Sequence, residues 1–302
     1  MQKLSAIMNK NSSTPLVSIV MPTYNRANFI VETINSIQKQ TYSNWELIIV
    51  DDGSTDQTSG IVSNFCDDRI HYHKQQHLGM EHARNFGLEK SRGEFIGFMD
   101  SDDLWAINKL HRQLSVFEEH PYIYFCLTGA YEFKTHGKPL VFFYKQRSGL
   151  KFGDLFLSFF KSELVASPPT LIFKRQCLET IGLMQNVELA HIHFILALTL
   201  HFKGAILYEA LLYRRMHESS YSSINHAKRH NDGIKLIRHY KNMLPLNVYS
   251  EAALRSHINF GEACLRKKLR LRATQEFFKA WKCQPLNIIP IKKIAKAWLQ
   301  PL

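Results

Sequence analysis

The sequence has no apolar run long enough to span a membrane. A spanning helix needs about 18 apolar residues, whereas the longest candidate, FILALTLHF at 194–202, is short and is bounded by His193 and Lys203. The first residues, MQKLSAIMNKNSST, also lack the apolar centre of a signal peptide, and we expect a flexible tail over residues 1–14. These absences argue against an integral membrane protein and predict a chain that works in the cytoplasm.

Cysteines are few, odd in number and widely spaced. The five are Cys66, Cys126, Cys177, Cys264 and Cys283. This scatter fits neither a disulfide framework nor a cysteine-rich zinc site. We therefore expect free thiols in a reducing compartment.

Acidic residues are scarce near the C-terminus. From Tyr221 onward, sixteen lysines and arginines stand against four aspartates and glutamates, which accounts for the whole net charge of +12. Residues 1–220 are therefore balanced. The basic stretch is either the solvated face of a helical region or a docking surface for anionic lipid or a phosphorylated acceptor. Nucleic acid is a poorer candidate because the stretch has no recognised binding motif.

The first half of the chain alternates apolar, β-branched runs with helical periodicity. Continuous apolar strands separated by helices predict an α/β fold with a mostly parallel, Rossmann-like sheet covered on both faces. Ser54 is expected to cap the second helix. The predicted strands are 17–21, 45–50, 69–73 and 94–99, and the predicted helices are 28–40, 55–64, 80–90 and 108–119.

The second half predicts a less regular continuation and then a helical region. YIYFCLTGAYEF and LVFFY read as a hairpin with Gly137 and Pro139 in its turn. TLIF and AILYEALLYR read as strands, with helices around 174–181 and 191–202 between them. From Ser223 the chain is basic and helical. The predicted organisation is a tail over 1–14, an α/β domain over 15–222 and a helical basic appendage over 223–302.

Polar clusters follow three of the predicted strands, as PTYNR, DDGST and DSDD. Ligands of such sheets bind beyond the carboxyl ends of the strands. A carboxylate of Asp51 or Asp52 can accept hydrogen bonds from a ribose or from a base N–H. The alternative for this pair is an Asx turn combined with helix capping.

Three acids within four positions, Asp100, Asp102 and Asp103, end the apolar run GEFIGFM. Mutual repulsion would destabilise this loop without a cation. Carboxylate oxygens suit Mg²⁺ and Mn²⁺, and Mg²⁺ commonly combines one or two carboxylates with substrate phosphates. The alternative, acids at a helix N-terminus, accounts for Asp103 but hardly for all three. We therefore expect acids at positions i and i+2, such as Asp100 and Asp102, to hold a cation against a phosphate, and Asp103 to serve the following helix.

Two long stretches, PLVSIVMPTYNRANFIVETINSIQKQTYSNWELIIVDDGSTDQT and GMEHARNFGLEKSRGEFIGFMDSDDLW, resemble family 2 glycosyltransferases with the GT-A nucleotide-sugar fold. The resemblance covers about residues 15–120, with several linked motifs in order. It continues more weakly from PPTLIFKRQCLETIG to YRRMHESSYS. It implies transfer of a sugar from a nucleotide diphosphate donor, often UDP, with inversion.

The same resemblance implies roles for individual residues. It places Asp102 as the principal cation ligand, and Mn²⁺ or Mg²⁺ there would make the diphosphate a better leaving group. Further cation contacts are implied for Asp100 and His217. Contacts with the nucleotide sugar are implied for Thr23, Tyr24, Asp51, Asp52, Arg84, Asn85 and Asp100.

The chain departs from the family pattern where the catalytic base is expected. Relatives carry a Glu-Asp pair whose Asp takes the proton of the acceptor hydroxyl, whereas this chain reads NVELAHIHF, with His191 in place of the Asp. His191 can serve as the base because imidazole titrates near neutral pH. Alternatively, Glu188 reaches the same place through a shifted loop, or transferase activity is lost or weak.

Three functions follow as hypotheses. The first is a metal-dependent inverting glycosyltransferase that builds surface polysaccharide on a saccharide or lipid-linked acceptor, with its basic region (223–302) on the inner face of the plasma membrane. The second is a nucleotide-binding or scaffold protein that has lost the base. The third, a nucleotidyltransferase, is disfavoured because the loop PTYNRANF has no glycine.

Overall fold

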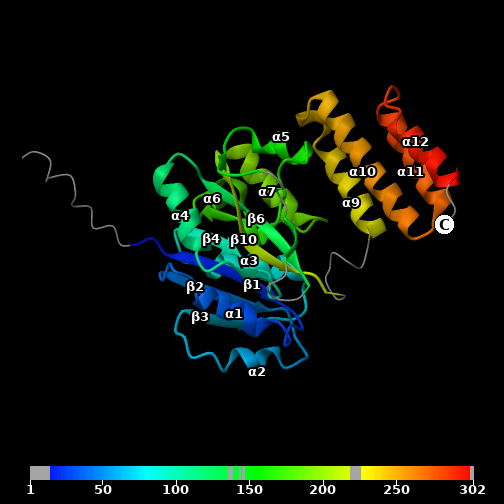
Figure 1. Ribbon diagram of the computed structural model, residues 1–302. Helices are drawn as coiled ribbons and strands as arrows, with labels where there is room; N and C mark the ends of the chain where they lie inside the picture. The colour runs from blue at the N-terminus through cyan, green and yellow to red at the C-terminus, as the bar shows by residue number, and fades with distance from the viewer. Residues whose placement is uncertain (1–13, 135–138, 143, 145–146, 218–225, 300–302) are drawn as a thin grey trace, which may run out of the picture. The chain divides into compact units, whose positions relative to one another are not determined.

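A computed structural model describes residues 14–134, 139–142, 144, 147–217 and 226–299 (Figure 1). Residues 1–13 of the predicted tail, Gly137 of the predicted turn, and Ser223, where the helical region was predicted to begin, lie outside these ranges. Two compact units result. The sheet unit comprises Met1–Phe152, Ser167–Asn186 and His193–Arg215. The helical unit comprises Gly153–Ala166, Val187–Ile192 and Met216–Leu302.

The strands of the described residues join one sheet in the order β3-β2-β1-β4-β9-β6-β10-β5, with β7 beside β6 and β8 beside β10. The first four strands in this order are parallel to one another, as predicted. β9 then runs antiparallel between β4 and β6. The strands are β1 (Val17–Thr23), β2 (Trp45–Asp51), β3 (Ile70–Lys74), β4 (Phe95–Phe98), β5 (Leu104–Trp105), β6 (Phe125–Phe133), β7 (Pro139–Phe142), β8 (Leu150–Lys151), β9 (Ile172–Lys174) and β10 (Gly204–Arg215).

Burial explains why the strands could be read from the sequence. Every residue of β1, β2 and β4 is buried, so these strands appear as apolar runs without alternation. The predicted hairpin is the antiparallel pair β6–β7. Pro139 was predicted in its turn but is the first residue of β7, where it pairs with Phe133.

Helices pack on the sheet through their apolar faces. α1 buries Ile30, Ile34 and Ile37, while α3 packs against β1 and β2. α7 begins in the helical unit and continues into the sheet unit. The helices here are α1 (Ile30–Gln38), α2 (Thr58–Val62), α3 (Met80–Lys90), α4 (Lys109–Glu119), α6 (Cys177–Ile181) and α7 (Ala190–His201), with the 3-10 turn η1 (Pro168–Thr170).

The second helix starts later than predicted. Ser54 does not cap it, because the Ser54 Oγ accepts a hydrogen bond from the Asn25 amide, 29 residues away in sequence, at 2.9 Å. The Asp56 carboxylate instead accepts from the Thr58 amide at 3.0 Å, at the first residue of α2. A contact between two loops therefore engages the Ser54 side chain, which the local sequence had predicted to cap the helix.

In the helical unit, each helix from α9 to α12 packs against the next one along the chain, and Figure 1 shows these helices side by side. α10 packs against α5, α9 and α11, and α11 packs against α12. Residues 153–166 and 187–192, predicted within the α/β domain, group with this unit. Its helices are α5 (Leu155–Phe160), α9 (His226–His239), α10 (Leu246–Arg266), α11 (Arg270–Cys283) and α12 (Ile289–Leu299), with the 3-10 turn η2 (Lys241–Met243).

None of the helices in the described part of the chain combines the length and the apolar character that crossing a membrane requires.

A buried lysine fastens α4 to the sheet. Lys109 is fully buried, its Nζ lies 4.5 Å from the centroid of the Trp105 ring, and it donates a hydrogen bond to Gln113. The Gln113 amide in turn donates to the Cys126 carbonyl at 2.7 Å and to the Thr170 carbonyl at 3.0 Å. Burial lowers the pKa of Lys109 to about 7.

We predict that the free energy of unfolding of the wild type rises with pH because of Lys109, and that Lys109→Met removes this rise. Between pH 7 and the ordinary lysine pKa, the unfolded chain binds a proton that the folded chain does not. The free energy of unfolding of the wild type should therefore rise with pH relative to the variant, by up to about 1.4 kcal/mol per pH unit. Urea denaturation from pH 7 to pH 10 measures this difference. Lys39→Met, at an exposed lysine after α1, should give no such slope, and a flat difference for Lys109→Met would contradict the assignment.

Candidate functional site

Three loops meet at the carboxyl ends of β1, β2 and β4. Parallel pairing sets Thr23 opposite Asp51, and the Met99 amide donates to the Val20 carbonyl at 2.9 Å. Arg26 connects the first loop to the third, because its Nε lies 3.1 Å from the Asp102 Oδ2. The structure thus places the three polar clusters at one edge of the parallel strands and joins the first cluster to the third through an ion pair.

Both carboxylate oxygens of Asp51 accept hydrogen bonds from groups of the protein itself. It is fully buried, its Oδ1 accepts from the Ser54 amide at 2.7 Å, and its Oδ2 accepts from the Tyr72 hydroxyl at 2.5 Å. Burial and the Asp51 carboxylate together raise the pKa of Tyr72 to about 12. The bond to Ser54 closes a local side-chain–backbone turn, as in one of the two interpretations of this pair, but the helix capping in that interpretation does not follow because α2 begins only at Thr58.

Asp52 holds the loop that leads into α3. Its Oδ1 accepts from the Leu78 amide at 2.8 Å and from the Gln75 side chain at 2.7 Å. Its Oδ2 accepts from the Gly79 amide at 2.9 Å and lies 2.9 Å from the His77 Nδ1. Only 4% of the Asp52 side chain is exposed. This carboxylate therefore determines the shape of residues 75–79.

The same loop supplies an aromatic surface. The ring of His77 stacks on Tyr24, with 4.2 Å between centroids and 27° between planes, and Tyr24 is 40% exposed. Next to Tyr24, the buried Thr23 Oγ1 has no hydrogen-bond partner among the described residues. A flat, partly exposed ring pair suits stacking with a planar ligand. His77 carries no signal in the sequence, because only folding brings its ring onto Tyr24.

Arg84 and Asn85, neighbours on α3, do different things. Arg84 is 2% exposed, and its Nη2 donates to the Asp100 Oδ1 at 2.8 Å. Its Nε and Nη1 have no hydrogen-bond partner within the described residues, although Nη1 lies 3.8 Å from a Glu81 oxygen. Asn85 instead binds the backbone of Met184. Its side-chain Nδ2 donates to the Met184 carbonyl at 2.8 Å, and its Oδ1 accepts from the Met184 amide at 2.9 Å.

The three clustered acids have separate environments. The side chains of Asp100 and Asp102 stay partly exposed, at 34% and 19%. Asp103 is buried, and its Oδ1 accepts from the Arg215 amide at 2.9 Å. Burial, together with the charges of Asp102 and Asp100, raises the pKa of Asp103 well above its ordinary value.

The expectation that Asp103 serves a following helix is wrong. Residues Leu104–Trp105 form β5, and α4 begins only at Lys109. Asp103 instead holds the end of β10 through Arg215. The Arg215 guanidinium reinforces this link by donating to the Asp102 carbonyl at 3.0 Å and to Glu32 at 2.6 Å.

Asp100 and Asp102 could hold a divalent cation. Both present carboxylate oxygens to solvent, which suits Mg²⁺ or Mn²⁺. Each is paired with an arginine, Arg84 for Asp100 and Arg26 for Asp102, so their charges are partly balanced within the protein. The oxygen donors therefore suit such a cation in kind, and a cation at Asp102 would compete with Arg26.

The residues predicted to act later in the chain belong to the helical unit. His217 is half-buried, two residues beyond the end of β10. His191 is half-buried in the first turn of α7. Glu188 is exposed and lies 3.1 Å from Lys235 and 3.8 Å from Lys228.

Glu188 is a poor proton acceptor in this arrangement. A hydrogen bond with Asp232 and another with Lys235 lower the pKa of the Glu188 carboxyl below its ordinary value. A lower pKa weakens a general base at neutral pH.

Comparisons with known proteins agree with the fold and the order of the motifs. A model of Glycosyl transferase family 2 matches residues 18–182. The UDP-Glc:alpha-D-GlcNAc-diphosphoundecaprenol beta-1,3-glucosyltransferase WfgD of Escherichia coli is 47% identical over 102 residues, 33% of this chain and 40% of WfgD. The putative teichuronic acid biosynthesis glycosyltransferase TuaG of Bacillus subtilis is 38% identical over 143 residues, 46% of this chain and 56% of TuaG. Matches to such curated relatives span from 16% to 56% of the relatives' own length.

Solved structures share the architecture over most of the chain. S. aureus TarS 1-349 in complex with UDP-GlcNAc gives a TM-score of 0.64 at 20% identity, covering 94% of this chain and 89% of that one. The mannosyltransferase PcManGT from Pyrobaculum calidifontis, in complex with GDP-Man and Mn²⁺, gives 0.61 at 20% identity, covering 93% and 79%. Likeness at this identity speaks for the fold, and it confirms the predicted α/β fold of the GT-A type.

We predict that Asp52→Asn loosens the loop over residues 75–79. Asparagine has one oxygen acceptor and replaces the other with an amide that cannot accept from the Leu78 or Gly79 N–H. Leaving such a group unsatisfied costs about 1–3 kcal/mol. Urea denaturation and hydrogen exchange of the two amides measure the effect.

Asp68→Asn is the matched control, because Asp68 is exposed and makes no side-chain hydrogen bond or ion pair to any residue that the structure describes. Equal stability and equal exchange for Asp52→Asn and Asp68→Asn would show that Asp52 does not hold the loop.

Proposed function

Since this chain belongs to Glycosyl transferase family 2, we propose that it transfers a sugar from a nucleotide-diphosphate donor to a saccharide or lipid-linked saccharide acceptor. One observation carries the proposal: the Tyr24–His77 ring pair and the carboxylates of Asp100 and Asp102 sit on loops that emerge from one edge of the parallel strands. That edge is where open α/β sheets bind ligands. A nucleotide diphosphate needs both a surface for its base and compensation for its charge.

In the proposed donor site, the base lies against the exposed ring of Tyr24. Asp52 supports this surface by fixing the loop that carries His77. The unsatisfied Thr23 hydroxyl provides a further hydrogen bond to the nucleoside. UDP is our proposed nucleotide, supported by TarS, whose structure contains UDP-GlcNAc, and by WfgD, whose name includes UDP-Glc.

The diphosphate would meet the two partly exposed acids. Mn²⁺ or Mg²⁺ held by Asp102 and Asp100 would neutralise the diphosphate and make it a better leaving group. Arg84 fixes the orientation of Asp100 from its buried position on α3. Arg26, released from Asp102, would become available to a phosphate oxygen. We propose His217 as a further contact of the cation or the diphosphate.

Transfer with inversion requires a base on the acceptor side. The acceptor hydroxyl oxygen bonds to the anomeric carbon while the bond from that carbon to the diphosphate oxygen breaks. The base takes the hydroxyl proton, and we propose His191 for this role. Glu188 is the weaker candidate because Lys228, Lys235 and Asp232 already engage its carboxylate.

The acceptor is proposed to belong to cell-surface polysaccharide synthesis. The names of TuaG and WfgD refer to teichuronic acid and to a diphosphoundecaprenol acceptor. The excess of lysine and arginine over 223–302 suits work beside an anionic membrane surface.

We predict that Asp102→Asn abolishes sugar transfer. The variant loses one negative charge at the proposed cation site, so Mn²⁺-dependent release of UDP from a UDP-sugar should fall by about 100-fold or more. Asp68→Asn, which removes an exposed acid, should retain wild-type turnover. Full Mn²⁺-dependent activity of Asp102→Asn would contradict the proposed cation ligand.

A second prediction separates the two candidate bases. His191→Ala should lower kcat by about 10²–10⁴-fold, the usual contribution of a general base, with little change in the Mn²⁺-dependent affinity for UDP. Glu188→Gln should keep most of the activity. If neither substitution slows turnover while Asp102→Asn abolishes it, the base lies elsewhere. A wild-type chain that binds UDP but neither hydrolyses nor transfers any sugar would favour a nucleotide-binding protein without catalysis.

A further inference from the structure

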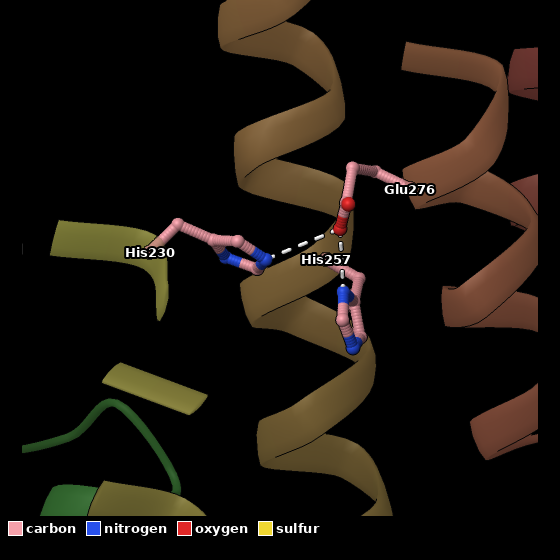
Figure 2. Close-up of side chains that lie close together, drawn as sticks. All are labelled: His230, His257 and Glu276. Carbon is pink, nitrogen blue, oxygen red and sulfur yellow. Dashed lines mark hydrogen bonds and ion pairs between the residues drawn. The ribbon is translucent and has the colours of Figure 1, made fainter. Parts of the chain in front are cut away.

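The helical unit contains a buried cluster of two histidines and a glutamate. His230 on α9, His257 on α10 and Glu276 on α11 point toward one another (Figure 2). The His230 Nε2 lies 3.1 Å and the His257 Nδ1 lies 2.7 Å from the same carboxylate oxygen, Glu276 Oε2. One ligand atom from each residue lies within 4.8 Å of the others.

The surroundings hold these side chains in place. Only 6% of the His230 side chain, 11% of His257 and 6% of Glu276 is exposed. The ring of His230 stacks on Phe260 with 4.4 Å between centroids. Its second nitrogen, Nδ1, lies 3.2 Å from the Ser256 Oγ. A hydrogen bond from the second ring nitrogen is the usual support of a metal-binding histidine.

Two of the three spacings between ligand atoms approach those of a small tetrahedral site, and the spacing between the two histidine nitrogens is at most 4.8 Å. Metal–ligand bonds of 2.0–2.1 Å set tetrahedral ligand atoms about 3.3 Å apart. The two nitrogen–oxygen distances of 3.1 and 2.7 Å need only a small expansion to reach this value. Two imidazoles and one carboxylate are ligands that Zn²⁺ accepts readily, whereas Mg²⁺ prefers oxygen atoms alone.

The cluster is not closed on all sides. His230 and His257 line a pocket of about 850 Å³ within the helical unit. The same pocket is lined by cationic side chains, among them Lys228, Lys279 and Lys282, and by the acids Glu188 and Asp232. Lys279, which is 55% exposed, lies 2.6 Å from the other carboxylate oxygen, Glu276 Oε1, and leaves Oε2 to the histidines.

We propose that His230, His257 and Glu276 form a zinc-type metal site with three protein ligands and a fourth position open to the pocket. Such a site would tie α9, α10 and α11 together. Its fourth position takes water or an anionic oxygen ligand, which the neighbouring lysines favour. The proposal does not depend on the nucleotide-sugar chemistry, because all three ligands and the pocket lie within the helical unit.

The test is metal binding by the full chain, purified without a histidine tag and stripped of metal. After addition of Zn²⁺ or Co²⁺ and removal of the excess, elemental analysis should find one equivalent per chain in the wild type. Bound Co²⁺ should give d–d absorption without the charge-transfer band of a cysteine ligand. Zn²⁺ should also raise the melting temperature.

Variants assign the bound metal to the cluster. His257→Gln should lose the equivalent, whereas His111→Gln, at an exposed histidine of α4, should retain it. Should His257→Gln fail to fold, Ser256→Ala leaves all three ligands and removes the support of His230, and it should weaken binding by about 10-fold or more. Asp102→Asn should bind Zn²⁺ like the wild type, which separates this site from the proposed Mn²⁺ site.

Two results would overturn the proposal. One is a wild-type chain that retains no Zn²⁺ or Co²⁺, in which case the three side chains are a hydrogen-bonded triad alone. The other is bound metal that neither His257→Gln nor Ser256→Ala affects, or that shows cysteine charge transfer.

Discussion

The parallel hydrogen bonding of β1 to both β2 and β4 is the constraint on which the candidate site depends. Neighbouring parallel strands end at the same edge of a sheet, so the loops that follow them have to meet there. The pairing of Thr23 with Asp51 fixes how far each strand extends before its loop begins. The buried apolar strands therefore do more than stabilise the fold, because their register sets the positions of the polar groups.

The acids at this edge are not equivalent, and their partners explain why. Asp51 and Asp52 satisfy amides and a phenol inside the protein, so they shape the loops. Asp103 is buried and anchors β10. Only Asp100 and Asp102 combine partial exposure with a balancing arginine. Crowded carboxylates are tolerated here because each is hydrogen-bonded, paired or open to solvent.

The sequence predicted the parallel half of the fold well, since strands buried on both faces leave continuous apolar runs. It did not predict that β9 inserts antiparallel between β4 and β6, because short antiparallel strands carry no separate pattern. The predicted roles of individual residues were wrong where a side chain makes its contact with a residue far away in the sequence. Ser54 was predicted as a cap but accepts from Asn25, and Asp103 was predicted at a helix but binds Arg215, 112 residues away. The buried triad of the helical unit was likewise invisible, since its members come from three separate helices.

In the proposed function, this edge of the sheet binds a nucleotide sugar through a divalent cation. Calorimetric titration of the wild-type chain with a UDP-sugar, with Mn²⁺ and then with EDTA, tests it most directly. We expect one nucleotide bound per chain in Mn²⁺ and at least about tenfold weaker binding in EDTA, a difference of about 1.4 kcal/mol. Failure of UDP-sugars and other nucleotide sugars to bind in Mn²⁺ would contradict the account.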